Sequence, residues 1–275
     1  MTTTQILITS NSLPLMQELK EVYGARYLLK RLIWRDLKVR YNNTALGVFW
    51  NVLQPLAMMI IFVLFLGLLF RDQTYGVPTS IYTYSALCFW HFFSRALSQG
   101  GMSFISFQGL ITKVYFPRLI APISYVAGAA VDFFVAYGLL ILLQLFYGAF
   151  NFKQFLFVPI IFAGLFLFAL SLAILFSALS AKYRDCVHLI PLIMQLWVFC
   201  CPIMYPYSIV PERYLWLYNL NPLVGYIQLF RWAVTSSSPF PDISCVLISV
   251  IVTIVFITMS LVYFVRVSPT LVDEL

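Results

Sequence analysis

The long uncharged stretches of this chain limit its fold more than any other feature. After Arg40 no charged side chain occurs before Arg71, and further apolar runs follow along the rest of the 275 residues. A helix needs about 20 apolar residues to cross the roughly 30 Å hydrocarbon core of a bilayer. Hydrophobic residues make up 62% of the sequence and charged residues only 10%, whereas soluble domains carry about 25% charged residues. The sequence therefore predicts an all-α polytopic membrane protein.

Six apolar runs are long enough to cross the membrane as helices. Two shorter ones, 211–219 and 222–234, are bounded by prolines and are expected to form short re-entrant helices on the periplasmic side, before the last span. We expect 1–25 to be an N-terminal tail, 26–265 the transmembrane domain and 266–275 a C-terminal tail. The six expected spans are 45–70, 80–102, 119–148, 155–180, 187–204 and 243–265.

The distribution of basic residues sets the expected orientation. Six spans place both termini on one side, and cytoplasmic termini give the inner segments twelve Lys and Arg residues and the outer segments four. Cytoplasmic loops of membrane proteins carry the excess of Lys and Arg. Both termini are therefore predicted to be cytoplasmic. The net charge of +7 indicates anionic lipid headgroups or a cytoplasmic protein as partners, not nucleic acid.

Residues 26–41 are expected to form an amphipathic helix in the cytoplasmic interface. Its apolar positions recur every four residues, and three cations share another face: Leu29, Ile33, Leu37 and Tyr41 against Arg31, Arg35 and Lys38. Two interpretations stay open. The helix either anchors the first span only, or it also docks a cytoplasmic partner.

Residue patterns typical of catalysis, metal binding and ATP binding are missing from the sequence. His91 and His188 fall in different expected spans without an acidic neighbour, which favours packing roles. The five cysteines have neither disulfide-framework nor metal-ligand spacing and are expected to be small buried side chains. No loop of the form G-x-x-x-x-G-K-[ST] is present, so ATP-driven transport needs a separate ATPase. We predict a chain that is not an enzyme and holds no metal or cofactor of its own.

Asp132 is an acidic residue deep within an expected span. A carboxylate near the middle of the bilayer costs at least about 2.5 kcal/mol on insertion scales and is a functional candidate by default. Apart from the histidines, Arg95 is the only other ionisable residue at comparable depth. A structural polar contact between Asp132 and Arg95 is therefore favoured, and a proton-coupled role is the alternative.

Four segments resemble the permease subunits of type-2 ABC exporters for bacterial surface polysaccharides, the O-antigen and capsule export family, to which teichoic acid exporters are related. The resemblance runs in family order across residues 26–265. The segments are WRDLKVRYNNTALGVFWNVLQPL (34–56), LITKVYFPRLIAPISYVAGAAVDFF (110–134), LSAKYRDCVHLIPLIMQLWVFCCPIMYP (179–206) and YNLNPLVGYIQLFRWAV (218–234).

The resemblance implies a homodimer with a polysaccharide channel between the two copies, in the bacterial inner membrane. Each copy would dock one cytoplasmic ABC ATPase subunit, which binds ATP and Mg, and the substrate would be an undecaprenyl-linked glycan. The loop between the second and third spans couples such permeases to the ATPase, here about Ser103 to Arg118, and the amphipathic helix rests against it. The residues expected at this interface are Arg31, Arg35, Lys38, Lys113, Tyr115, Arg118 and Arg184.

The segment between the fifth and the last span concentrates aromatic side chains. Aromatic rings with polar edges suit a sugar chain that slides along weak contacts, although interfacial belts also account for Trp and Tyr. By the resemblance, six residues are expected to line or gate the outer exit of the channel: Tyr205, Tyr207, Tyr214, Trp216, Tyr218 and Tyr226.

The predicted function is therefore ATP-driven export of a lipid-linked O-antigen or capsular polysaccharide. A type-2 ABC permease for teichoic acid, a small lipid or a drug has the same architecture and stays open as the first alternative. A membrane-embedded glycan-modifying enzyme and a proton-coupled transporter have weaker support, because the catalytic constellation is missing and Asp132 stands nearly alone.

Overall fold

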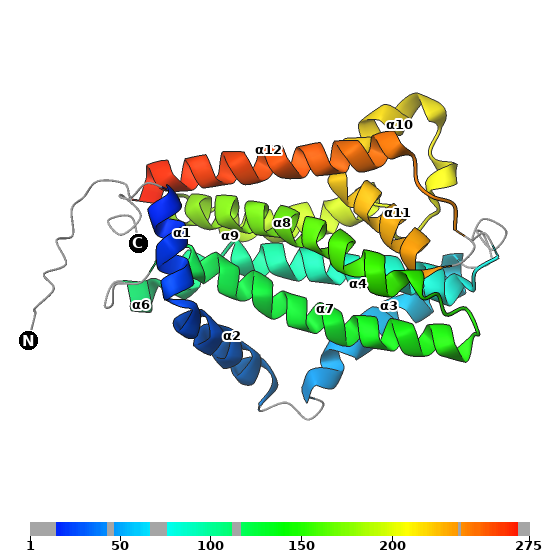
Figure 1. Ribbon diagram of the computed structural model, residues 1–275, viewed down its shortest axis with the longest axis horizontal. Coiled ribbons are helices and arrows are strands. Elements are labelled where there is room, and N and C mark those ends of the chain that lie inside the picture. The colour runs from blue at the N-terminus through cyan, green and yellow to red at the C-terminus, as the bar shows by residue number, and fades with distance from the viewer. Residues whose placement is uncertain (1–14, 43–46, 67–75, 112–116, 236–237, 269–275) are drawn as a thin grey trace, which may run out of the picture.

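The computed structural model describes residues 15–42, 47–66, 76–111, 117–235 and 238–268, and this part of the chain is helical without strands. Its long helices lie side by side along the longest axis of the molecule (Figure 1). Each of the six expected spans overlaps a helix: α3 (Trp50–Leu66), α4 (Thr79–Gly100), α7 (Ile120–Phe146), α8 (Lys153–Lys182), α9 (Cys186–Trp197) and α12 (Ile243–Val267).

Within the described residues, three helices are long and apolar enough to cross a membrane: α7, α8 and α12. Helices α3 and α9 are also apolar; α9 is shorter than its expected span, whereas residues 45–46 and 67–70 of the span expected around α3 lie outside the described residues. A single turn of 3-10 helix at Gly47–Phe49 precedes α3, where Gly47 has a positive φ of 52°. At its C-terminal end α9 passes into the 3-10 turn Val198–Cys200. Pro202 follows, which has no backbone N–H to donate to a further helical turn.

The N-terminal part of the described chain forms two helices at one end of the bundle. Helix α2 (Arg26–Tyr41) has the bounds predicted from its four-residue periodicity. Helix α1 (Leu15–Gly24) lies within the segment expected to be a tail. The Glu18 side chain of α1 is buried, and its Oε1 accepts a hydrogen bond of 3.3 Å from Ser268 Oγ, just beyond α12. The start of the described chain is therefore joined to the end of its last helix.

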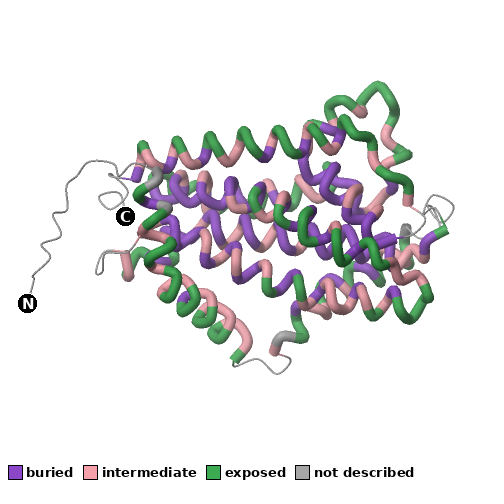
Figure 2. Tube along the Cα trace, viewed as in Figure 1, coloured by how far each residue is buried: buried purple, intermediate pink, exposed green. Residues whose placement is uncertain are grey.

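The core is built around α4, which packs against α7, α8, α3 and α11. Figure 2 shows buried residues concentrated along the middle of the bundle, whereas α12 leaves one long side exposed. Aromatic rings fill the space between the central helices. The ring centroids of Phe133 and Phe162 lie 4.3 Å apart, and those of Phe89 and Phe230 4.1 Å apart. Gly100 allows α4 to approach α8 closely, since a Cβ there would lie 2.7 Å from the Ala173 Cβ.

The two short helices expected before the last span are α10 (Glu212–Asn219) and α11 (Pro222–Val234). Helix α10 lies at the end of the bundle opposite α1 (Figure 1). Helix α11 is mostly buried between α12, α8 and α4. Two amides from other segments cap its C-terminal carbonyls: Gln144 Nε2 donates to Val234 O at 2.5 Å, and Asn151 Nδ2 donates to Ala233 O at 3.3 Å.

Candidate functional site

The cytoplasmic coupling segment expected from the sequence begins with two short helices. Helices α5 (Ser103–Ser106) and α6 (Gln108–Ile111) follow α4 and lie at the same end of the bundle as α1 (Figure 1). Lys113 and Tyr115, both expected at the ATPase interface, lie outside the described residues. Arg118 precedes α7, and its Nη1 donates a hydrogen bond of 3.1 Å to Ser268 Oγ.

Helix α2 contacts this segment directly. The Arg35 guanidinium lies 5.1 Å from the ring centroid of Phe107, which joins α5 to α6. Leu32, one turn earlier on α2, is buried in an apolar cluster that includes Phe104 and Phe107. The face that carries Arg31 and Lys38 is exposed. Helix α2 therefore places the Arg35 cation and the apolar side chain of Leu32 next to the coupling segment.

Arg184 reaches the same segment from another direction. It lies on the short connection between α8 and α9, at a cavity of about 400 Å³. Gln108 of α6 and His188 of α9 share this cavity, which Ile105, Ser180, Ala181 and Val187 complete. The structure thus brings Arg35 and Arg184 to the α5–α6 segment from two elements far apart in sequence.

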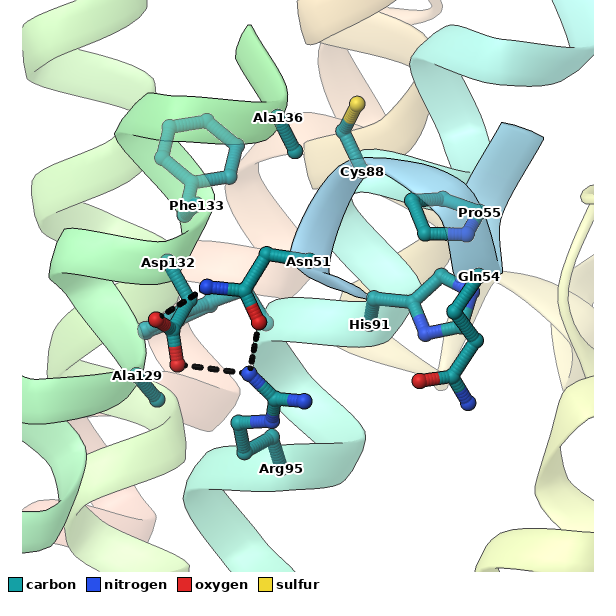
Figure 3. A pocket seen from close by; sticks show the side chains of 11 residues that line it. Asn51, Gln54, Pro55, Cys88, His91, Arg95, Ala129, Asp132, Phe133 and Ala136 are labelled. Atoms are coloured by element: carbon teal, nitrogen blue, oxygen red, sulfur yellow. Dashed lines mark hydrogen bonds and ion pairs between the residues drawn. The ribbon is translucent and has the colours of Figure 1, made fainter. Parts of the chain in front are cut away.

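A cluster of charged and polar side chains surrounds Asp132 on α7 (Figure 3). The ion pair with Arg95 expected from the sequence is present, with Nη1 at 2.6 Å from Asp132 Oδ2. Asn51 of α3 bridges the two charges, because it donates to Asp132 Oδ1 at 2.5 Å and accepts from Arg95 Nη1 at 2.7 Å. A cavity of only about 20 Å³ adjoins the cluster, room for about one water molecule. This is a packed polar contact between α3, α4 and α7.

The end of α2 supplies a second cation to Asp132. Arg40 Nη1 donates to Asp132 Oδ2 at 2.6 Å, and the Tyr41 hydroxyl donates to Oδ1 at 2.7 Å. Arg40 also pairs with Asp36, one turn earlier on α2, and its Nη2 donates to Gln99 Oε1 of α4 at 3.1 Å. Because charge-assisted hydrogen bonds are stronger than neutral ones, this site fixes the end of α2 to the bundle. We call Asp36, Arg40, Arg95 and Asp132 the charge cluster.

Sequence reasoning found half of the charge cluster. Arg95 and Asp132 were identified by their depth, but Arg40 was counted among the cytoplasmic cations. A signal for its role exists in the sequence. At 100° per residue, Asp36 and Arg40 lie on the side of the helix opposite Arg31, Arg35 and Lys38.

Three of the six expected outer aromatic residues lie next to one another at the other end of the bundle. The Tyr218 hydroxyl donates to the Tyr205 hydroxyl at 3.2 Å, and the ring centroids of Tyr207 and Tyr218 lie 6.0 Å apart. The Tyr207 hydroxyl donates to Asn219 Oδ1 at 3.0 Å. Burial raises the pKa of Tyr205, Tyr207 and Tyr218, so all three hydroxyls stay neutral near physiological pH.

The other three expected residues are placed differently. Tyr214 and Trp216 on α10 are exposed, the latter by 67% of its surface. Tyr226 lies on α11, buried to 3% exposure, and its hydroxyl is 2.8 Å from Thr253 Oγ1 of α12. It packs so closely against Gly164 of α8 that a Cβ there would lie 2.6 Å from the ring. The structure therefore does not bring Tyr226 together with the outer tyrosines.

Comparison with known proteins fits these arrangements. The sequence matches the ABC-2 type transporter family over residues 27–235. The chain belongs to this family. An O-antigen export system permease protein, RfbA, of Klebsiella pneumoniae is 30% identical over 218 residues, which are 78% of this chain and 83% of the relative. The RfbA of Myxococcus xanthus is 29% identical over 81% of this chain and 85% of its own length. The polysialic acid transport protein KpsM of Escherichia coli is 24% identical over 75% of this chain and 80% of its own length.

Membership in the ABC-2 family makes the chain a multi-pass membrane protein. Its relatives are transporter subunits and not enzymes, and members of the family work with an ATPase partner in export. The matched region begins at the start of α2 and ends with α11, so it includes both the charge cluster and the outer tyrosines. Helix α1 lies before it.

Proposed function

We propose that the chain is the transmembrane subunit of an ATP-driven exporter that carries a lipid-linked O-antigen or capsular polysaccharide across the bacterial inner membrane. The observation that carries this proposal is the 30% identity to an O-antigen export permease, which extends over 83% of that relative. An undecaprenyl-linked glycan enters from the cytoplasmic side and leaves near the outer tyrosines. Both termini of the chain are cytoplasmic, and the six helices that match the expected spans all cross the membrane.

Two copies of the chain enclose the channel in this proposal. The apolar faces of α3 and α9 support it, because each leaves large side chains exposed in a single chain. These include Ile61 and Phe65 on α3, and Leu192 and Leu196 on α9 with Phe199 in the 3-10 turn that follows it. Helix α9 is also shorter than a full span, which suits a position beside a wide conduit better than a position facing lipid.

Two copies of a cytoplasmic ABC ATPase drive the transport and bind ATP and Mg. They dock at the end of the bundle where α2, α5–α6 and Arg184 meet. Arg31 and Lys38 present exposed cations there, and Arg35 stays exposed above the Phe107 ring. Hydrolysis in the partner moves these elements, and the movement reaches the transmembrane helices. Teichoic acid, a small lipid or a drug is the alternative cargo for the same architecture.

The outer aromatic residues contact the glycan as it leaves. Tyr214 and Trp216 expose flat rings on α10, and sugar rings pack on such surfaces without being held by many fixed hydrogen bonds. Tyr205, Tyr207 and Tyr218 hold the segment around α10 in place through their hydrogen bonds. A conduction path has to bind weakly at several places, which this exposed aromatic surface allows.

Co-purification with a cytoplasmic ABC ATPase from the same organism tests the proposal. The reconstituted complex should hydrolyse ATP faster when an undecaprenyl-linked glycan is present in the same vesicles. Trp216→Ala should lower glycan export while ATPase docking is unchanged. Leu217→Ala, at an exposed neighbour on α10, is the matched control and should export normally. Uphill transport by the chain without an ATPase would contradict the proposal, as would stimulation by small lipids and not by the glycan.

A further inference from the structure

We propose that the charge cluster is a reversible latch that couples α2 to the transmembrane helices, with Arg40 as its moving part and Asp132 as the positioning residue on α7. This latch presupposes the proposed function, because a cytoplasmic ATPase must move α2. The cluster opens when α2 is displaced and closes again when α2 returns. In the open state the transmembrane helices can rearrange, and in the closed state they cannot.

Helix α2 is placed to act as a lever between the coupling segment and the bundle. Leu32 and Arg35 contact the α5–α6 segment through Phe107, and Arg40 contacts Asp132. Arg35 and Arg40 are five residues apart, about 7.5 Å along a helix. A rigid helix that is pushed at one contact must move at the other. The two contacts thus form a short, continuous connection from the cytoplasmic end to α7.

The charges of the cluster can be divided without leaving any of them unpaired. Arg40 has two carboxylates, Asp132 on α7 and Asp36 on its own helix. Asp132 has two cations, Arg40 and Arg95 of α4. When α2 moves away, Arg40 keeps Asp36 and Asp132 keeps Arg95, so each half is electrically neutral. A buried charge without a partner is strongly unfavourable, and this arrangement avoids one in both states.

The surroundings of the cluster permit such a movement. The side chains of Asp36 and Arg40 are 22% and 17% exposed, so water can reach the α2 half when it separates. On α7 the facing residue is Gly128, one turn before Asp132. A Cβ at Gly128 would lie 3.3 Å from the Asp36 Oδ2, so the missing side chain lets α2 approach α7 closely. Where α2 meets the charge cluster, α7 therefore presents Gly128, which has no side chain, and the carboxylate of Asp132.

A cross-link between α2 and α7 tests whether the latch has to open. Asp36→Cys with Gly128→Cys would join the two helices, in a Cys200→Ser background that removes the exposed cysteine. With an added thiol oxidant such as diamide, we expect the disulfide to form several-fold more slowly when the complex with its ATPase holds ATP, because ATP populates the open state. Asp36 belongs to the charge cluster, so the reduced variant should export less than the wild type. The disulfide should abolish the export that remains, and a reductant should restore that level. Asp36→Ser with Gly128→Ser is the matched control for the substitutions themselves.

A second variant removes the α2 half of the cluster and leaves the other half neutral. Asp36→Asn with Arg40→Gln keeps the pair of Arg95 and Asp132, so the bundle should fold and dock its ATPase. ATP hydrolysis should continue, and the amount of glycan exported per ATP should fall at least about tenfold. Gly138→Ala on α7, where a Cβ meets nothing within 4 Å, should leave this ratio unchanged.

The outcomes separate the latch from the choice of cargo. Cross-linking that ATP slows supports the latch even if no polysaccharide is moved, because this readout involves no cargo. Undiminished export by the cross-linked protein would overturn the latch, and so would equal cross-linking rates with and without ATP. Wild-type export per ATP in the Asp36→Asn, Arg40→Gln variant would do the same. A chain that binds no ATPase would overturn both proposals.

Discussion

The contact between Arg231 of α11 and Tyr82 of α4 should be one of the strongest single interactions in the bundle. Arg231 is 1% exposed, and its guanidinium carbon lies 3.7 Å from the Tyr82 ring centroid. Its Nη1 donates to the Tyr82 hydroxyl at 3.0 Å, and its Nε donates to the Tyr82 main-chain carbonyl at 3.3 Å. A substitution at Tyr82 can therefore separate the contribution of the hydroxyl from that of the ring.

Tyr82→Phe keeps the ring and the carbonyl but loses the hydroxyl, and a hydrogen bond to a charged group contributes about 1.5–3 kcal/mol. Tyr82→Leu also removes the aromatic face, which adds about 2 kcal/mol for a desolvated cation–π contact. These two contributions together predict a coupling energy of about 3.5–5 kcal/mol in a double-mutant cycle of Tyr82→Leu with Arg231→Met. Arg231 is one of the four basic residues expected in the outer segments, and in the structure it anchors α11 to α4.

Equilibrium unfolding in detergent micelles, followed by circular dichroism, measures the four free energies of this cycle. Lys153, which is exposed, and Trp232, which is partly buried, serve as the matched control, with Lys153 Nζ 5.5 Å from the Trp232 ring centroid. Its coupling energy should not exceed about 1 kcal/mol, because exposed cation–π contacts are weak. A coupling below about 0.5 kcal/mol between positions 82 and 231 would refute the reasoning.

Four further substitutions test packing and charge in other parts of the molecule. Gly164→Ala forces a Cβ against the Tyr226 ring and should lower the unfolding free energy by about 1–3 kcal/mol, whereas Gly138→Ala, in open space, should raise it by about 0.5–1 kcal/mol. Asp132→Ala leaves two arginines without their shared acceptor and should cost about 3–5 kcal/mol, measured by the same unfolding assay. Burial raises the pKa of Glu18 above 4.5, so its ionisation opposes folding and wild-type stability should fall as the pH rises through and above that value. Glu18→Gln should reduce this fall, and unfolding scans between about pH 4.5 and pH 7 measure the difference.

The elements of the fold were predictable because they depend on local patterns. The four-residue periodicity of 26–41 gave the bounds of α2, and continuous hydropathy gave α7, α8 and α12 within two residues at each end. Helix α1 was not predicted, since its ten residues resemble no family segment and its stability comes from tertiary contacts such as that of Glu18. A short helix of this kind is decided by what it packs against, which the local sequence does not contain.

In the charge cluster, the sequence predicted only the residues that lie deep within an expected membrane span. Asp132 and Arg95 stood alone among apolar neighbours, so their pairing followed from the cost of a lone charge. Arg40 lies 92 residues from Asp132, and no local rule brings them together. The burial of Tyr226 could not be read from the sequence, because an aromatic residue in an aromatic-rich segment looks the same whether it lines an opening or fills the core.

The length of α8 has a consequence for where an ATPase can reach this protein. Its 30 residues extend for about 45 Å, whereas the hydrocarbon core is about 30 Å thick. A tilt of about 48° would be needed to immerse the whole helix, beyond the roughly 40° limit seen for membrane helices. Part of α8 must therefore project beyond the hydrocarbon core. Lys182 ends the helix two residues before Arg184, so a surplus at this end would lift that arginine clear of the lipid headgroups, within reach of a soluble protein.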